Sequence, residues 1–218
     1  MSWFASSHRA GRPGRRIGVA LAALTVGVLA ACQPTTAGAA AIVGNHRLGE
    51  SSVQQDVAAL LAERGGSDSA TGELKRATVQ RWVYGEILQA AAAERGVKVT
   101  ARQVRDQRAA LVARNGQAAF RQAVLASGVP TRAADELLRL VVTQDALASA
   151  LVPDTPGADP VALGQARQEA LARTLGAKAR QLQIQVNPRY GAFDVSRGAV
   201  VPLASGGLAV PAGSGGAG

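Results

Sequence analysis

Residues 79–104 read "VQRWVYGEILQAAAAERGVKVTARQV", and this stretch decides the fold class. Apolar residues recur along its first half at the spacings of three and four that mark one face of an α-helix: Val79, Val83, Ile87 and Ala90. Gly96 suits the left-handed backbone that ends a helix. Thr100, with Gln103 three residues later, forms a capping box that begins the next helix. The stretch therefore predicts a helix, a stop, a short extended link and a second helix.

The same periodicity predicts a helix on either side of this pair and beyond. The expected helices run from about Ser51 to Arg64, from about Glu73, from Thr100 to Arg114, around Phe120, from about Thr131 to Leu151, and from Pro160 to about Arg180. Asp159 is expected to cap the last of them, with Pro160 at the first helical position. The expected inward-facing residues are Val53, Val57, Leu60, Leu61, Phe120, Val124, Leu125, Leu137, Leu140, Val141, Leu147, Ala148, Leu151, Val161, Leu163, Leu171 and Leu175.

Short strands are expected near both ends of the helical region. The segment "AAIVGNHRL" at residues 40–48 predicts two strands joined by a two-residue turn at Gly44-Asn45. After the last helix, apolar residues alternate with glutamines over residues 182–186, which predicts a half-buried strand. We expect this strand to pair with residues 41–43 and so to tie the end of the chain to its start.

Two of the five aromatic residues after residue 31 lie close together, at Tyr190 and Phe193. They follow the last predicted strand and the turn at Asn187-Pro188. We expect both rings to fix this turn against the helices; a ligand contact is the alternative. Burial of each ring would contribute about 1.5–3 kcal/mol.

These patterns predict a mainly α fold, a helical domain in which a small β element pairs the first and last strands. The expected organisation has four parts. Residues 1–31 are a lipoprotein signal peptide, residues 32–41 a tether, residues 42–197 the helical domain, and residues 198–218 a glycine- and proline-rich disordered tail.

The signal prediction rests on charge and on one cysteine. Residues 1–31 contain four arginines and no acidic residue, and an uncharged apolar stretch runs from Ile17 to Cys32. The sequence Leu29-Ala30-Ala31-Cys32 resembles the lipobox of bacterial lipoproteins. That resemblance implies cleavage between Ala31 and Cys32 and lipidation of Cys32, hence a lipid anchor at the extracytoplasmic face of the cell membrane. The alternative is an ordinary cleaved signal with a cysteine nearby.

Charge narrows the class of partner. The formal net charge is +9, but removal of residues 1–31 would leave 20 basic against 15 acidic residues, a net charge of +5. An exported, tethered chain does not meet nucleic acid, so we expect anionic lipid headgroups, unfolded exported proteins or an acidic partner instead. The basic residues of the middle region are Arg102, Arg105, Arg108, Arg114, Arg121, Arg132 and Arg139. A solvated helical face is the alternative explanation for them.

Residues 79–104 also resemble the N-terminal domain of SurA-like periplasmic chaperones and the related PrsA foldases. In that family a helix ends in Ala-x-x-x-Gly-[Val/Ile]-x-Val-[Ser/Thr], and the matching residues here are Ala92, Gly96, Val97, Val99 and Thr100. Residues 40–48 resemble the family's first strand, although Gly49 replaces the usual Ser or Thr. Residues 170–194 resemble its closing helix and strand. The resemblance spans about residues 40–194 and implies a chaperone-like helical domain.

The chain departs from the family where the family carries its isomerase. Family members that isomerise prolyl bonds carry parvulin domains between the long helix and the closing helix, but only residues 153–160, "PDTPGADP", lie there. The histidine–cysteine pair of a parvulin site is also missing, since His46 is the one histidine and Cys32 the one cysteine after residue 31. We therefore expect no enzyme activity.

Other chemistry has little support in the sequence. His46 has no second histidine near it for a metal site, so we expect neither a metal nor a cofactor. Asp135 and Glu136 lie at a helix start, where they favour the positive end of the helix dipole. The candidate peptide-binding residues are Trp82, Tyr84 and Phe120, with core packing as the alternative. The expected function is a non-catalytic, membrane-anchored module that binds unfolded polypeptides. The alternatives are a structural adaptor lipoprotein and, with less support, a prolyl isomerase.

Overall fold

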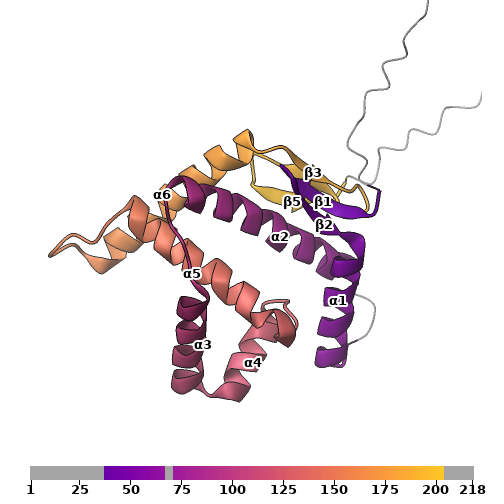
Figure 1. The fold of residues 1–218 in the computed structure, drawn as a ribbon, viewed down its shortest axis with the longest axis horizontal. Helices are drawn as coiled ribbons and strands as arrows, with labels where there is room; N and C mark the ends of the chain where they lie inside the picture. Colours follow the sequence, from indigo (N-terminus) through magenta and orange to yellow (C-terminus); the bar gives the residue numbers. More distant parts are fainter. Residues whose placement is uncertain (1–36, 67–70, 204–218) are drawn as a thin grey trace, which may run out of the picture. The chain divides into compact units, whose positions relative to one another are not determined.

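The computed structural model describes residues 37–66 and 71–203. All of these residues belong to one compact unit. The predicted signal peptide, Cys32 and most of the predicted tail lie outside the described residues. Within them the chain is mainly helical with two small antiparallel sheets, which confirms the predicted fold class (Figure 1).

The elements follow the predicted order with close boundaries. They are β1 (Ala39–Val43), β2 (His46–Gly49), α1 (Glu50–Arg64), α2 (Thr71–Glu94), α3 (Ala101–Asn115), α4 (Gln117–Ala126), the short 3-10 helix η2 (Thr131–Ala133), α5 (Ala134–Leu151), α6 (Pro160–Gln181), β3 (Ile184–Val186), β4 (Ala192–Asp194) and β5 (Ala199–Val201). β4 and β5 were not predicted, because three residues carry no alternating pattern long enough to identify a strand.

The predicted caps are present. The Thr100 hydroxyl accepts the Gln103 N–H at 3.3 Å, and the Gln103 side chain accepts the Thr100 N–H at 2.8 Å. Asp159 accepts the Val161 N–H at 3.0 Å, with Pro160 in the first turn of α6. Gly96 has a φ of 67°, as the end of α2 requires.

The three-stranded sheet joins the two ends of the domain. Its order is β2-β1-β3, and both pairs are antiparallel. Ile42 lies opposite Gln185, which confirms that the closing strand pairs with the first one. The Asn187 side chain then donates to the Ala39 carbonyl at 3.1 Å and to Glu50 at 2.7 Å, so the turn after β3 holds the start of both β1 and α1.

Two predicted boundaries are wrong. β1 begins at Ala39, inside the predicted tether, because its alanines pair with neighbouring strands and are fully buried. β5 lies inside the predicted disordered tail, where it pairs with β4. The Gln80 side chain on α2 explains why β5 forms here. Its oxygen accepts the Val200 N–H, and its amide nitrogen donates to the Gly198 carbonyl at 3.3 Å. Gln80 thus takes the place of a neighbouring strand.

The core has three clusters. One joins the sheets to α2 through Val79, Val83 and Ile87, a second lies among α3, α4 and α5, and a third joins α2, α5 and α6. Two predicted core residues are instead exposed, Val141 at 41% and Val161 at 67%. On α5, Leu138 is buried, although the pattern did not single it out. Val161 lies in the first turn of α6, where the neighbouring residues are exposed too.

Candidate functional site: a cleft over helix α2

A cleft of about 550 Å³ lies over the middle of α2. β2 and α1 border it on one side, and η2 and α5 on the other. Figure 1 shows the strands and α5 on opposite sides of α2. Its lining residues are Leu48, Ser52, Gln55, Asp56, Thr78, Arg81, Trp82, Gly85, Glu86, Gln89, Val129, Arg132, Ala133, Glu136, Leu137, Arg139 and Leu140. This volume is within the usual range for ligand-binding pockets, about 300–1,000 Å³.

The floor of the cleft is apolar where α2 meets α5. Trp82 is half-buried and packs against the core beneath the sheet. Gly85 allows the two helices to approach closely, since a Cβ added there would lie 3.0 Å from the Leu140 side chain. Leu48 of β2 and Leu137 of α5 continue this apolar surface on the two sides.

The rim carries charges of both signs in equal number. The acidic residues are Asp56, Glu86 and Glu136, and the basic residues are Arg81, Arg132 and Arg139. Asp56 on α1 pairs with Arg132 on η2 at 2.5 Å, so one ion pair bridges the two sides. Glu86 pairs with His46. Burial lowers the pKa of Arg81, and the negative charges of Asp56 and Glu136 oppose this shift. Arg81 also donates a hydrogen bond to the Gly128 carbonyl at 3.1 Å.

The strand beside the cleft has an open edge. Two 2.9 Å backbone hydrogen bonds show which positions of β1 face β3: Gly44 to Gln183, and Asn187 to Ala40. Backbone groups alternate in direction along a strand, so the N–H and C=O of Ile42 also point toward β3. Arg47 lies opposite Ile42 on β2, and its own N–H and C=O therefore point away from β1. No described residue bonds to these two groups. β2 therefore offers an unpaired strand edge next to Leu48.

A set of polar contacts holds the end of α1 against the corner between α4 and α5. Glu63 accepts the Thr131 N–H at 2.9 Å and the Thr131 hydroxyl, and it lies 3.8 Å from Arg121. Arg64 donates to the Leu125 carbonyl. With the Asp56–Arg132 pair, these contacts fix the distance between the two sides of the cleft.

Glu63 makes this arrangement sensitive to acid. The hydrogen bond from the Thr131 hydroxyl is the main cause that lowers the pKa of Glu63, aided by the Thr131 N–H and by Arg121 and Arg132. A carboxyl whose pKa is lowered on folding stabilises the fold at pH values above its pKa in the unfolded chain, here about 4.5. This contribution is lost as the pH falls through the pKa of the folded state. We expect the melting temperature to fall below about pH 4.5, with a weaker acid dependence in Thr131→Val. Melting curves from about pH 3 to pH 7 test this, and identical acid limbs for the two proteins would contradict it.

The three candidate peptide-binding residues do not come together. Trp82 lines the cleft, but Tyr84 lies on the opposite face of α2, where its hydroxyl bonds to Gln144 at 2.7 Å. Burial raises the pKa of the Tyr84 hydroxyl. Phe120 is only 5% exposed, within the cluster of α3, α4 and α5, where its ring packs in the core, as the alternative for this residue expected. Of the three, Trp82 alone belongs to this site.

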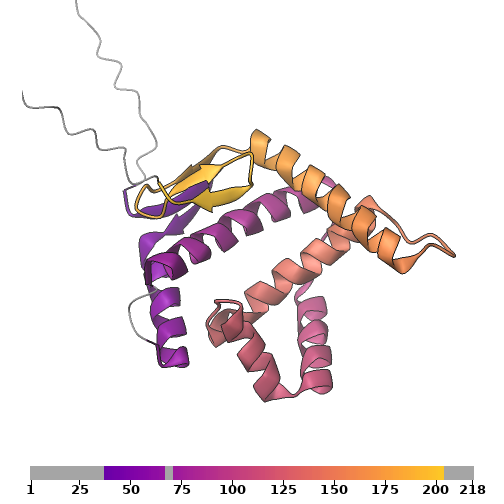
Figure 2. The ribbon, with the colours of Figure 1, turned by 180° about the vertical axis from the view of Figure 1, so that it is seen from behind.

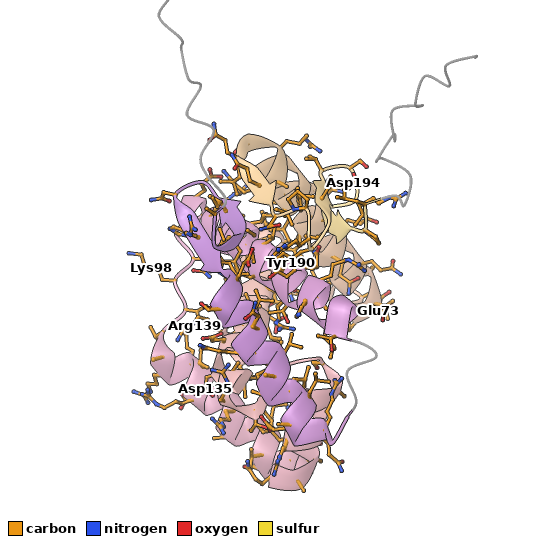
Figure 3. All side chains as sticks on the ribbon, turned by 90° about the vertical axis from the view of Figure 1, so that its right-hand side faces the viewer. Glu73, Lys98, Asp135, Arg139, Tyr190 and Asp194 are labelled. Carbon is orange, nitrogen blue, oxygen red and sulfur yellow. The ribbon has the colours of Figure 1, made fainter. Side chains whose placement is uncertain are left out.

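The arginines of the middle region lie on four elements, α3, α4, η2 and α5. Five of the seven make contacts within the domain: Arg102 with Asp106, Arg108 with Asp135 and the Phe120 ring, Arg121 with Glu63, Arg132 with Asp56, and Arg139 with the Val99 carbonyl. Figure 3 shows Asp135 and Arg139 on α5, away from Tyr190 and Asp194 in the strand region. Of the set, only Arg105 and Arg114 make no hydrogen bond, ion pair or ring contact with a described residue.

His46, which the sequence offered as a lone histidine, pairs with a neighbouring carboxylate. His46 lies at the start of β2 with its ring 61% exposed and paired with Glu86. In residues 37–66 and 71–203, no three His, Cys, Asp or Glu side chains gather as a metal site would require. The cleft residues from α1 and the Gln89 side chain were not anticipated, because no local pattern distinguishes a polar residue on a cleft wall from one on a solvated face.

Comparison with known proteins gives no relative: no family model, curated protein or solved structure matches the chain. None of the described helices has the length and apolar character that crossing a bilayer requires.

Proposed function

We propose that this chain is a membrane-anchored, extracytoplasmic lipoprotein whose helical domain binds extended segments of unfolded exported polypeptides in the cleft over α2. The observation that carries the proposal is the free edge of β2 beside an apolar floor. An extended segment could pair with the outward N–H and C=O of Arg47 while its alternate side chains reach Leu48, Trp82 and Leu140.

The balanced charge of the rim supports a broad choice of segments. Three carboxylates and three guanidinium groups surround the apolar floor, so a bound segment of either charge meets a complementary group. Binding of this kind requires no covalent chemistry. The resemblance to SurA-like chaperones supports the same function.

The anchor is proposed from residues 29–32 alone. Lipidation of Cys32 after cleavage of residues 1–31 would hold the domain at the outer face of the membrane. Mass spectrometry of the amino terminus of the native protein tests it. A diacylglyceryl group on Cys32 is the expected result, and an unmodified terminus would contradict the anchor.

The cleft can be tested with two neighbouring glutamines on α1. Gln55 lines the cleft and Gln54 does not, and both are exposed. We expect Gln55→Phe, which fills the cleft, to weaken binding of a reduced and alkylated unfolded protein by about tenfold, a loss of about 1.4 kcal/mol. Gln54→Phe should bind like the unchanged chain. Fluorescence anisotropy of the labelled client measures both affinities.

Trp82 supplies an independent readout. It is the one tryptophan after Trp3, so the chain from residue 33 onward has a single indole, placed on the cleft floor. We expect client binding to shift its emission. Equal affinities for the Gln54 and Gln55 variants, with no change in Trp82 emission, would place the binding elsewhere.

A further inference from the structure

A second cleft lies on the other face of α2. It has a volume of about 560 Å³ and lies among α2, α6 and the turn that joins β4 to β5. Figure 2 shows these three parts together in the view from behind. The lining residues are Tyr84, Ile87, Ala172, Arg173, Leu175, Gly176, Ala179, Arg180, Val195, Ser196, Arg197 and Gly198.

The charge of this cleft is one-sided. Its lining includes three arginines, Arg173, Arg180 and Arg197, and no acidic residue, whereas the first cleft has equal numbers of each sign. The Arg180 guanidinium lies above Gly176, since a Cβ added there would be 3.9 Å from its Nη1 atom. Arg180 makes no hydrogen bond or ion pair with any described residue.

The other two arginines are held only weakly. Arg173 lies 3.5 Å from Glu169 in a pair in which both side chains are more than two-thirds exposed. Arg197 lies 3.4 Å from Asp194. The Asp194 carboxylate already accepts the N–H groups of Ser196 and Arg197 and the Ser196 hydroxyl, so it does not depend on the guanidinium. Exposed pairs of this kind add little to stability, so both guanidinium groups can turn to an incoming anion at small cost.

The floor between the arginines is apolar. Ile87 and Ala179 are buried at its base, Leu175 is half-buried, and Val195 is 41% exposed at the rim. A simple anion would leave this surface in contact with water. A ligand that joins a phosphate to an apolar group satisfies both parts, because arginine binds phosphate oxygens in a bidentate manner.

We propose that the second cleft binds an anionic phospholipid, with its phosphate against Arg173, Arg180 and Arg197 and its glycerol and first acyl carbons on Leu175 and Val195. This site is separate from the peptide cleft and from the arginines of residues 102–139. It would set one face of the domain against the membrane, and it does not depend on the proposed function.

Vesicle binding tests the proposal. The chain from residue 33 onward, which contains all the described residues of the compact unit, has no Cys32 and therefore no acyl anchor. We expect it to bind vesicles of phosphatidylglycerol and phosphatidylcholine in a flotation assay, and not vesicles of phosphatidylcholine alone. Arg180→Glu should weaken binding about tenfold or more, since it removes one attractive charge and adds a repulsive one at the contact.

Arg105→Glu on α3 is the matched control. It makes the same change of charge at an exposed residue that lies outside both clefts and has no hydrogen bond or ion pair with a described residue. Binding of this variant to the anionic vesicles should therefore fall by no more than about threefold. Val195→Ser keeps the charge and should weaken binding through the lost apolar contact. Equal losses for the two arginine variants, no binding to the anionic vesicles, or an unchanged Val195 variant would overturn the proposal. Binding of inorganic phosphate as tight as binding of the anionic vesicles would also overturn it, because the apolar part of the lipid would then contribute nothing.

Discussion

Gly191→Ala should destabilise the domain more than alanine at any other described glycine, by about 3–5 kcal/mol. Gly191 has a φ of 124°, which residues with a side chain rarely adopt, and it is buried between Tyr190 and β4. An added Cβ would lie 2.2 Å from the carbonyl oxygen of Val201 and 3.0 Å from its carbonyl carbon. The obstacle is backbone, which cannot rotate aside as a side chain can.

Relief of this clash would require β5 to move away from β4. Ala192 pairs with Val201 one residue beyond the glycine, so the movement would disrupt the two-stranded sheet and the contact of Val200 with Gln80. Denaturation by urea, monitored by circular dichroism, measures the loss of stability.

Gly198→Ala in the same hairpin is the control. Gly198 also has a positive φ, 61°, but an added Cβ would meet no atom within 4 Å. Backbone strain alone should therefore cost this variant about 1–2 kcal/mol. Similar losses for the two variants would show that the steric contact at Gly191 is not the cause.

Tyr190→Ala should lower stability by about 3 kcal/mol or more. The Tyr190 ring is 7% exposed and belongs to the cluster that joins both sheets to α2. Arg76 on α2 also donates to the Tyr190 carbonyl at 3.3 Å. Loss of the ring would leave a cavity where the end of the chain packs on the longest helix. Phe193 is half-buried against the same cluster, so Phe193→Ala should have a smaller effect, about 1–2 kcal/mol.

Tyr190→Phe separates the ring from its hydroxyl. The hydroxyl makes no hydrogen bond with a described residue, so this variant should retain stability to within about 1 kcal/mol.

Burial, and secondarily the charge of Glu50, raise the pKa of the Tyr190 hydroxyl. A group whose pKa is raised on folding stabilises the fold at pH values below its pKa in the unfolded chain. This contribution is lost as the pH rises through the pKa of the folded state. The melting temperature of the unchanged chain should therefore fall above about pH 10, and less so for Tyr190→Phe. Equal losses in the Phe and Ala variants would contradict packing of the ring as the main contribution.

Much of the fold could be predicted because it depends on neighbours in sequence. The capping box at Thr100, the stop at Gly96, the Asp159 cap and the hairpin turn at Gly44 each involve residues within about four positions of one another. The pairing of β3 with β1 joins distant residues, and two features predicted it: alternation over residues 182–186, and the resemblance to SurA-like chaperones.

The errors lie where distant residues decide the outcome. Residues 198–218 lack charge and contain many glycines, which favours disorder, yet Val200 is ordered because Gln80 and the α2 surface bind it. Phe120 was both an expected inward-facing residue and a candidate peptide contact, and packing of α4 on α3 buries its ring. Helical periodicity did not tell Leu138 from Leu137 on α5, since both lie within the same broad apolar stripe.

The sequence by itself determined the helices, their caps, the paired first and last strands, and the expectation of a lipid anchor at Cys32, because each depends on short-range spacing or on a local motif. Only the tertiary structure decided that Trp82 and Tyr84 line two different clefts, that one cleft is balanced in charge, and that the other carries three arginines and no acid. The physical reason is that a cleft is formed by side chains from several elements. Their distances depend on how helices pack, and one-dimensional periodicity does not contain that information.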